Sequence, residues 1–562
     1  MHRLIGKTAQ QVRLNSSFST STSATSLPQK VADVIINQLK LWGVKRIYGV
    51  IGDAIFGLME GLSRQNDLEW IGVKHESVAA IMASAEAKLT GRIGVCAAQM
   101  GPGLTNLMTG LGDANLDRVP VLAISGQAPT PKIGTAYKQY IDQQGLVQAI
   151  TGFSRIVVHP KAVVDTLAQA MFTAMEQAIP VHLSIPSDLW TLPCGAKPRE
   201  PIQIANQIAG HSQLQQAANL MLKAKRPLIL AGNRANHACD AIRKLADRWG
   251  CGIVMSYGAK GIIAGSHPYL LGGLGEGGNP FASDLCKQAD VVLAIGTSWW
   301  PEYHVPEHAQ VIHIEERISA IGEVIPSQVG IVGNIAEIIQ ALTEGITDYR
   351  LNPHWLQLVN QCKQVWNEQN ELERAISSSP LHPALIVSVV EQHIDKDAII
   401  ALDEGDVTLW FLRNFRGTAH HLVLSERWRT MGFGLPAAMA AKCSFPNRQV
   451  ICVTGDGGLG MVQADLITAA RYGLPITVIV FNNGTLQMEQ DKMMMKHLRP
   501  FGTDISNPNF VQIAEASGWV AKRAKTNDEL RIALDEAKST SKPYLIDVPT
   551  AKITHPDFQF QK

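Results

Sequence analysis

The chain has 562 residues, of which 46% are hydrophobic and 18% charged, and its formal net charge is +1 at pH 7. A chain of this length buries several hydrophobic cores, so about three domains are expected. The balanced charge gives no basic surface for nucleic acid. The sequence contains no run of about 18 apolar residues, so no membrane-spanning segment is expected. The expected partners are therefore small molecules.

Eight cysteines are scattered along the chain without a Cys-x-x-Cys pair, which argues against a zinc site or a disulfide framework and favours a reducing compartment. Residues 1–28 differ from the rest in composition. They carry Arg3, Lys7 and Arg13 and a Ser/Thr cluster, with no acidic residue before Asp33. This composition predicts a mitochondrial targeting segment; the alternative is a disordered tail on a cytoplasmic protein.

Short apolar runs alternate with helical patterns along the remaining chain, which is typical of βαβ units with parallel sheets. We expect three doubly wound α/β domains at 29–195, 202–345 and 380–555, with linkers at Pro193–Pro201 and Pro353–Leu381. The predicted strands are Arg46–Val50, Trp70–Val73, Ile93–Cys96, Val121–Ile124 and Val181–Ile185; then Pro227–Ala231, Ile253–Met255, Val291–Ile295 and Val311–Ile314; then Ala398–Leu402, Leu422–Leu424, Val450–Val453, Ile476–Val480 and Tyr544–Val548.

The sharpest motif lies in the third block. An apolar strand leads into Gly455-Asp456-Gly457-Gly458 and a helix expected to start near Leu459, and the next strand leads into Asn482-Asn483. Neighbouring parallel strands end at one edge, so the carboxylate and the amide should lie close together. They offer oxygen ligands for Mg²⁺, while the glycines and the helix start expose N–H groups to a diphosphate. Either half alone could be an ordinary turn.

The separation of 24 residues between Gly-Asp-Gly and Asn-Asn resembles the signature of the thiamine-diphosphate-dependent enzymes. The order of blocks over most of the chain resembles their pyruvate oxidase and acetolactate synthase group. The resemblance implies bound thiamine diphosphate and Mg²⁺, with the ion held by Asp456, Asn483 and the backbone carbonyl of Thr485. It also implies a second diphosphate contact at Gly405 and Asp406.

In this family a carboxyl group drives the aminopyrimidine of the cofactor to the tautomer that activates its thiazolium. Glu76, between a strand and an apolar helix, is the candidate; otherwise it only interacts with the helix dipole. Met431 resembles the residue that holds the cofactor bent, and the carbonyl of Arg429, where relatives often have Gly or Ala, would accept from its amino group. Glu76 and Asp456 lie on different domains, and in this family the two halves of the site meet across a dimer interface, so the resemblance implies a homodimer or homotetramer.

The residues expected to contact the substrate depart from the family pattern. Where pyruvate oxidases commonly show Phe-Gln-Glu, this chain has Lys138-Gln139-Tyr140. Gln139 is the candidate for a hydrogen bond to the substrate oxyanion, and Lys138 either faces an anionic substrate or reaches solvent. Glu489 lies at the offset of a catalytic Glu of pyruvate decarboxylases, and Lys492 at that of residues governing the second half-reaction of oxidases and acetolactate synthases.

Members of this group bind FAD in the central domain, which Gly232, Gly275, Gly296 and Glu315 match loosely; a domain without flavin is the alternative. The resemblance implies decarboxylation of a small 2-oxo acid, in first place pyruvate. Oxidation through FAD, acetolactate-type ligation and protonation to an aldehyde are the three outcomes, ranked in that order. A non-catalytic binding protein on the same fold is the remaining alternative.

Overall fold

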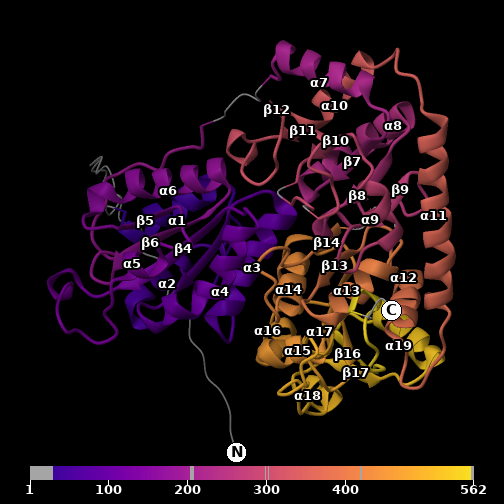
Figure 1. Cartoon of the computed structure of the whole chain (residues 1–562). Helices are drawn as coiled ribbons and strands as arrows, with labels where there is room; N and C mark the ends of the chain where they lie inside the picture. Colours follow the sequence, from indigo (N-terminus) through magenta and orange to yellow (C-terminus); the bar gives the residue numbers. More distant parts are fainter. Residues whose placement is uncertain (1–28, 203–207, 298, 302, 418–420, 559–562) are drawn as a thin grey trace, which may run out of the picture.

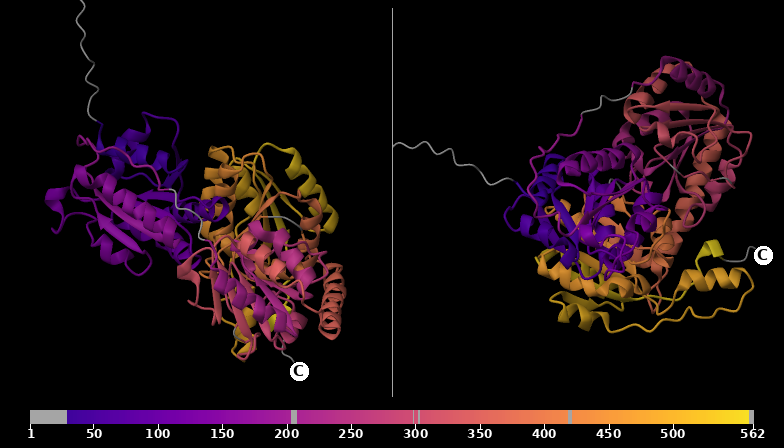
Figure 2. Two further views of the ribbon diagram at one scale, coloured as in Figure 1. Left: turned by 90° about the horizontal axis from the view of Figure 1, so that it is seen from above. Right: turned by 90° about the vertical axis from the view of Figure 1, so that its left-hand side faces the viewer.

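The computed structural model describes residues 29–558, except 203–207, 298, 302 and 418–420. The predicted targeting segment therefore lies outside the described residues. Figure 1 shows three lobes: an N-terminal domain on the left, a central domain at the upper right and a C-terminal domain below it; Figure 2 shows the molecule from two other sides.

Each lobe contains a six-stranded sheet in which every recorded pairing is parallel, so the predicted α/β fold with three parallel sheets is confirmed. The first sheet has the order β2-β1-β3-β4-β6-β5, the second β12-β11-β10-β7-β8-β9 and the third β14-β13-β15-β16-β18-β17. The strands are β1 (Arg46–Gly49), β2 (Glu69–Gly72), β3 (Gly94–Ala98), β4 (Val121–Gln127), β5 (Phe153–Ile156), β6 (Pro180–Pro186), β7 (Pro227–Ala231), β8 (Gly252–Met255), β9 (Leu270–Gly273), β10 (Val291–Ile295), β11 (Gln310–Glu315), β12 (Val329–Val332), β13 (Ile399–Leu402), β14 (His421–Val423), β15 (Val450–Gly455), β16 (Thr477–Asn482), β17 (Val520–Arg523) and β18 (Tyr544–Pro549).

Helices cover both faces of the sheets, as parallel sheets require. They are α1 (Val31–Leu41), α2 (Phe56–Leu62), α3 (Glu76–Thr90), α4 (Pro102–Leu116), α5 (Gln143–Val147), α6 (Val163–Gln177), α7 (His211–Lys223), α8 (Cys239–Trp249), α9 (Pro280–Cys286), α10 (Ile335–Gly345), α11 (Pro353–Arg374), α12 (Pro383–His393), α13 (Asp406–Asn414), α14 (Gly434–Ser444), α15 (Asp456–Val462), α16 (Leu466–Arg471), α17 (Gln487–Met495), α18 (Phe510–Ala516) and α19 (Asn527–Ser539). Helix α11, predicted as a polar helical linker, runs along the outside of the central domain towards the C-terminal one (Figure 1).

Four strands were not predicted: β5, β9, β12 and β17. Each is an edge strand of its sheet, and each alternates with or ends in partly exposed residues. An edge strand has a neighbour on one side only, so it needs a shorter apolar run than an interior strand.

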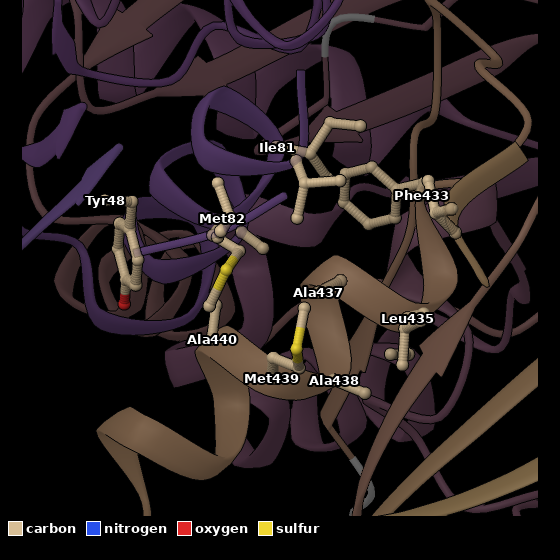
Figure 3. Packing of buried hydrophobic residues seen from close by; sticks show 14 of the residues in the cluster. Tyr48, Ile81, Met82, Phe433, Leu435, Ala437, Ala438, Met439 and Ala440 are labelled. Atoms are coloured by element: carbon tan, nitrogen blue, oxygen red, sulfur yellow. The ribbon is translucent and has the colours of Figure 1, made fainter. Parts of the chain in front are cut away.

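The N-terminal and C-terminal domains share one hydrophobic cluster, and each also has a cluster of its own. Helices α3 and α14 pack side by side, with Ile81 and Met82 facing the segment from Phe433 to Ala440 (Figure 3). Most side chains of α14 at this contact are alanines, which let the two helix backbones approach closely. The central domain has separate clusters around β7 to β12 and α11.

Within the described part of the chain, no helix combines the length and apolar character that crossing a membrane requires.

Candidate cofactor site

The carboxyl ends of β13, β15 and β16 meet at one edge of the third sheet. Gly455 pairs with Phe481, so Asp456 and Asn483 leave neighbouring strands side by side, as the sequence suggested. A cavity of about 240 Å³ opens at this edge. Its lining includes these predicted residues: Gly405, Asp406, Arg429, Met431, Gly455, Asp456, Gly457, Gly458, Asn483, Thr485 and Glu489.

Asp456 is buried and held firmly. Its Oδ2 accepts from the backbone N–H of Gly484 (2.6 Å) and from Asn507 Nδ2 (2.7 Å), and its Oδ1 accepts from Gly457 N–H (2.9 Å). Burial raises the pKa of this carboxyl because it disfavours the charged form. A divalent cation would offset that cost. Helix α15 begins at Asp456 itself, so the predicted start near Leu459 was three residues late.

The lining fits a diphosphate bound with Mg²⁺. Asp456, Asn483 and the carbonyl of Thr485 would supply hard oxygen ligands. Gly405 has φ 135°, a conformation that side chains rarely adopt, and it caps α13 at the cavity wall. At Gly457 a Cβ would stand 3.0 Å from both Met431 and Leu486, so a side chain there would press into the wall of the cavity.

Asp403 is a buried residue that the sequence reasoning missed. Its Oδ1 accepts from the backbone N–H groups of Glu404 (2.8 Å), Gly432 (2.8 Å) and Phe433 (3.2 Å), and its Oδ2 accepts from Thr454 Oγ1 (2.7 Å). One carboxylate thus joins the end of β13, the end of β15 and the segment carrying Met431. The available signal was an acidic residue directly after an apolar strand.

Arg429 contacts the central domain through its side chain. It adopts φ 53°, and its Nη1 donates to Glu276 Oε2 at 2.8 Å while its guanidinium lies 4.9 Å from the ring centre of Tyr257. Such a conformation costs a non-glycine residue roughly 1–3 kcal/mol. The contacts with Glu276 and Tyr257 of the central domain offset this cost.

Glu404 carries an unusual carboxyl in the cavity wall. It is 6% exposed, and its Oε1 has no hydrogen-bond partner among the described residues. Burial raises its pKa to about 7; Arg429 and Lys492 lower it, and Asp403 and Glu276 raise it. Both cations have other carboxylate partners, Glu276 for Arg429 and Glu489 for Lys492.

We expect Glu404→Gln to raise the melting temperature of the cofactor-free protein at pH 8 but not at pH 5. Between about pH 4.5 and 7 the Glu404 carboxyl keeps its proton in the folded protein but has lost it in the unfolded chain. The free energy of unfolding therefore falls as pH rises through that range, and it stays lower above pH 7. The loss is at most about 3 kcal/mol. Thermal unfolding at both pH values tests this, with Glu489→Gln as control because Glu489 lines the same cavity at 57% side-chain exposure. An equal gain at both pH values would contradict the explanation.

The structure of a single chain does not bring Glu76 or Gln139 to this cavity. Glu76 begins α3, and its Oε2 accepts from Asn106 Nδ2 at 2.9 Å. Gln139 lies in a turn of the same domain, and its neighbour Lys138 donates to Asp53 Oδ2 at 2.8 Å. The predicted catalytic residues thus form two separate groups, one in each terminal domain.

A second cavity, of about 720 Å³, lies where the three domains meet. Asn233, Arg234 and Glu316 line it from the central domain, Lys88 from the N-terminal domain and Glu426 from the C-terminal one.

The residues predicted to contact FAD do not line this cavity themselves. A Cβ at Gly232 would stand 2.2 Å from the carbonyl oxygen of Gly296, so these two glycines let β7 and β10 approach closely; Gly275 has φ 72°. Glu315 is buried and ion-paired with Arg234. Asn233 and Arg234, which follow Gly232, and Glu316, which follows Glu315, line the cavity instead.

A parallel sheet that gathers a carboxylate, an amide and a glycine-rich turn around one cavity defines an α/β protein with a candidate site for a diphosphate cofactor. Three family models match the chain: "Thiamine pyrophosphate enzyme, N-terminal TPP binding domain" at residues 29–146, the central domain at 214–342 and the C-terminal TPP binding domain at 403–548.

Relatives that match the chain over about nine tenths of its length belong to the same family. The chain is 34% identical to the putative thiamine pyrophosphate-containing protein YdaP of Bacillus subtilis (91% of this chain, 90% of the relative). It is 31% identical to a probable acetolactate synthase large subunit of Methanocaldococcus jannaschii (92% and 91%) and 29% identical to a pyruvate oxidase of Lactiplantibacillus plantarum (91% and 87%). The chain therefore belongs to the thiamine pyrophosphate enzyme family, in its pyruvate oxidase and acetolactate synthase group.

Proposed function

We propose that the protein decarboxylates a small 2-oxo acid, pyruvate in first place, and oxidises the remaining fragment as pyruvate oxidases do. The observation that carries the proposal is the cavity in which Asp456, Asn483, Thr485 and Met431 come together. Thiamine diphosphate, when bound, supplies a carbon nucleophile that adds to the carbonyl group and accepts the electron pair released as CO₂ departs.

Each predicted site residue then has a defined task. Asp456, Asn483 and the carbonyl of Thr485 would hold Mg²⁺, and Gly405, Asp406 and Gly455–Gly458 would surround the diphosphate. Met431 would support the cofactor, and the carbonyl of Arg429 would accept from its amino group. Glu76 would hold and move a proton at the cofactor, Gln139 would donate to the substrate oxygen, and Glu489 would lie near the substrate.

The active unit in this proposal is a homodimer, or a homotetramer built from such dimers. Glu76 and Gln139 are absent from the lining of the cavity around Asp456. A two-fold axis would bring the N-terminal half-site of one copy to the C-terminal half-site of another, giving equivalent sites. The domain ranges 29–195, 202–345 and 380–555 belong to the same proposal, as does mitochondrial localisation, which rests on the composition of residues 1–28.

FAD is the proposed second cofactor. The cavity between the domains, at about 720 Å³, is within the usual size of ligand pockets. It lies beside the ends of β7 and β11, the edge where open α/β sheets bind ligands. Gly232 and Glu315 would support this site through Asn233, Arg234 and Glu316, which line it; Gly275 and Gly296 are proposed from the resemblance alone.

We expect the purified protein to show a flavin absorption band and to release CO₂ from pyruvate. Acetyl product that forms only with an electron acceptor would support the oxidase assignment. Acetolactate without acceptor would favour the ligase alternative, to which the acetolactate synthase relatives point, and acetaldehyde would favour a simple decarboxylase. No flavin band after reconstitution with FAD would contradict the oxidase assignment; no turnover of any 2-oxo acid would leave a non-catalytic binding protein.

A further inference from the structure

Gln139 is held in a strained turn. The turn Tyr137–Tyr140 is closed by the hydrogen bond from Tyr140 N–H to Tyr137 O, and Gln139 occupies its third position with φ 59°, where glycine is usual. Strain of this kind persists only where the surroundings enforce it, typically at functional sites. Gly101 makes room for this turn, because a Cβ at residue 101 would stand 2.4 Å from the carbonyl oxygen of Gln139. The hydrogen bonds of Tyr140 N–H and of the Gln139 side chain hold the turn in place.

A chain of hydrogen bonds fixes which end of the Gln139 side chain is free. The backbone N–H of Ala54 donates to Gln99 Oε1 at 2.8 Å. A backbone N–H can only donate, so the oxygen of Gln99 must lie on this side and its amino group on the other. That amino group donates to Asp53 Oδ1 (2.5 Å) and to Gln139 Oε1 (2.9 Å). The oxygen of Gln139 is thus occupied, and its own amino group is left to donate elsewhere.

Asp53 secures this arrangement from the other side. Its Oδ2 accepts from Lys138 Nζ at 2.8 Å, so one carboxylate binds both Gln99 and the residue preceding Gln139. The hydrogen bonds from Lys138 and Gln99 hold the pKa of Asp53 below its usual value. Lys138 is therefore engaged with Asp53, which disfavours the idea that it selects an anionic substrate.

We propose that Gln99 and Asp53 are positioning residues that turn the amino group of Gln139 towards the substrate, where it donates to the carbonyl oxygen of the 2-oxo acid. This rests on the proposed function. A donor at this place stabilises negative charge as it develops on that oxygen. With the opposite amide orientation, the oxygen of Gln139 would face the same charge and repel it.

Gln99→Glu tests the orientation directly. Its carboxylate still accepts from Ala54 N–H but cannot donate to Gln139, so the Gln139 amide turns over and presents oxygen to the substrate. We expect kcat of the holoenzyme with pyruvate to fall by about 100-fold, the scale of losing one oxyanion donor. Gln148→Glu, an exposed Gln→Glu exchange in the same domain, should leave kcat unchanged.

The combination with Gln139→Ala separates positioning from other effects. If Gln99 acts through Gln139, the double variant is no slower than Gln139→Ala alone. The proposal would be overturned if the losses in kcat of the two single variants multiplied in the double variant. It would also be overturned if Gln99→Glu kept the kcat of the wild type. Crystal structures of the wild type and Gln99→Leu give a readout that needs no turnover: the Gln139 side chain should leave residue 99 in the variant, and an unchanged Gln139 would overturn the proposal even if no 2-oxo acid reacts. Inactive wild type would count against the proposed function alone.

Discussion

Asp456→Ala is expected to abolish magnesium-dependent binding of thiamine diphosphate. Asp456 is the only charged member of the proposed ligand set, and three hydrogen bonds orient its two oxygens. Without it, Asn483 and a backbone carbonyl offer no negative charge to the ion. Substitutions in the outer shell of metal sites already cost about 10- to 100-fold in affinity, so losing a direct ligand should cost more than about 100-fold. Calorimetric titration of the apoprotein with cofactor, with and without Mg²⁺, measures it.

Asp504→Ala is the matched control for this experiment. Asp504 pairs with Thr485 in an isolated β-bridge, yet its side chain is 89% exposed. The control should bind thiamine diphosphate like the wild type. Retention of tight, magnesium-dependent binding by Asp456→Ala would refute the proposed metal site and the function built on it.

Glu76→Gln is expected to lower the rate of CO₂ release by about 10²- to 10⁴-fold, the usual contribution of a general acid or base, while the cofactor still binds. The amide keeps the size of the side chain and its hydrogen bond with Asn106, but it can neither hold nor release the proton. Parallel assays of CO₂ release and calorimetric cofactor binding distinguish loss of chemistry from loss of binding.

Glu60→Gln, an exposed glutamate of the same domain that pairs with Lys30 and Arg64, should leave CO₂ release unchanged. A Glu76→Gln enzyme with the wild-type rate would remove the catalytic assignment of Glu76, although the metal site would stand.

The sequence alone was sufficient to predict the interior strands of each sheet. Strands such as β10 and β15 are buried along almost their whole length, and continuous apolar runs of this kind are easily recognised. The edge strands β5, β9, β12 and β17 were missed because their composition carries a weaker signal, although the edge strands β2 and β14 were predicted. In β17, for example, Lys522 and Arg523 are exposed, and only pairing with β18 makes the segment a strand.

The candidate site was predictable where a local motif determines it and unpredictable where distant segments meet. Asp456 and Asn483 follow strands, so strand order alone places them together. The role of Asp403 depends on N–H groups about 30 positions further along the chain. The contact between Arg429 and Glu276 spans 153 positions, and the link from Gln99 to Gln139 spans 40. No periodicity of the sequence encodes such pairs.

The packing of α3 against α14 (Figure 3) changes how the polypeptide should be divided. Although its first and last thirds are separated by a whole lobe, they bury a common interior in addition to one of their own, so excising either would expose the face that they share. The middle third is thus inserted between two segments that pack on each other. Gene fragments cut at the lobe boundaries would therefore be poor starting points for studying either half of the cofactor site.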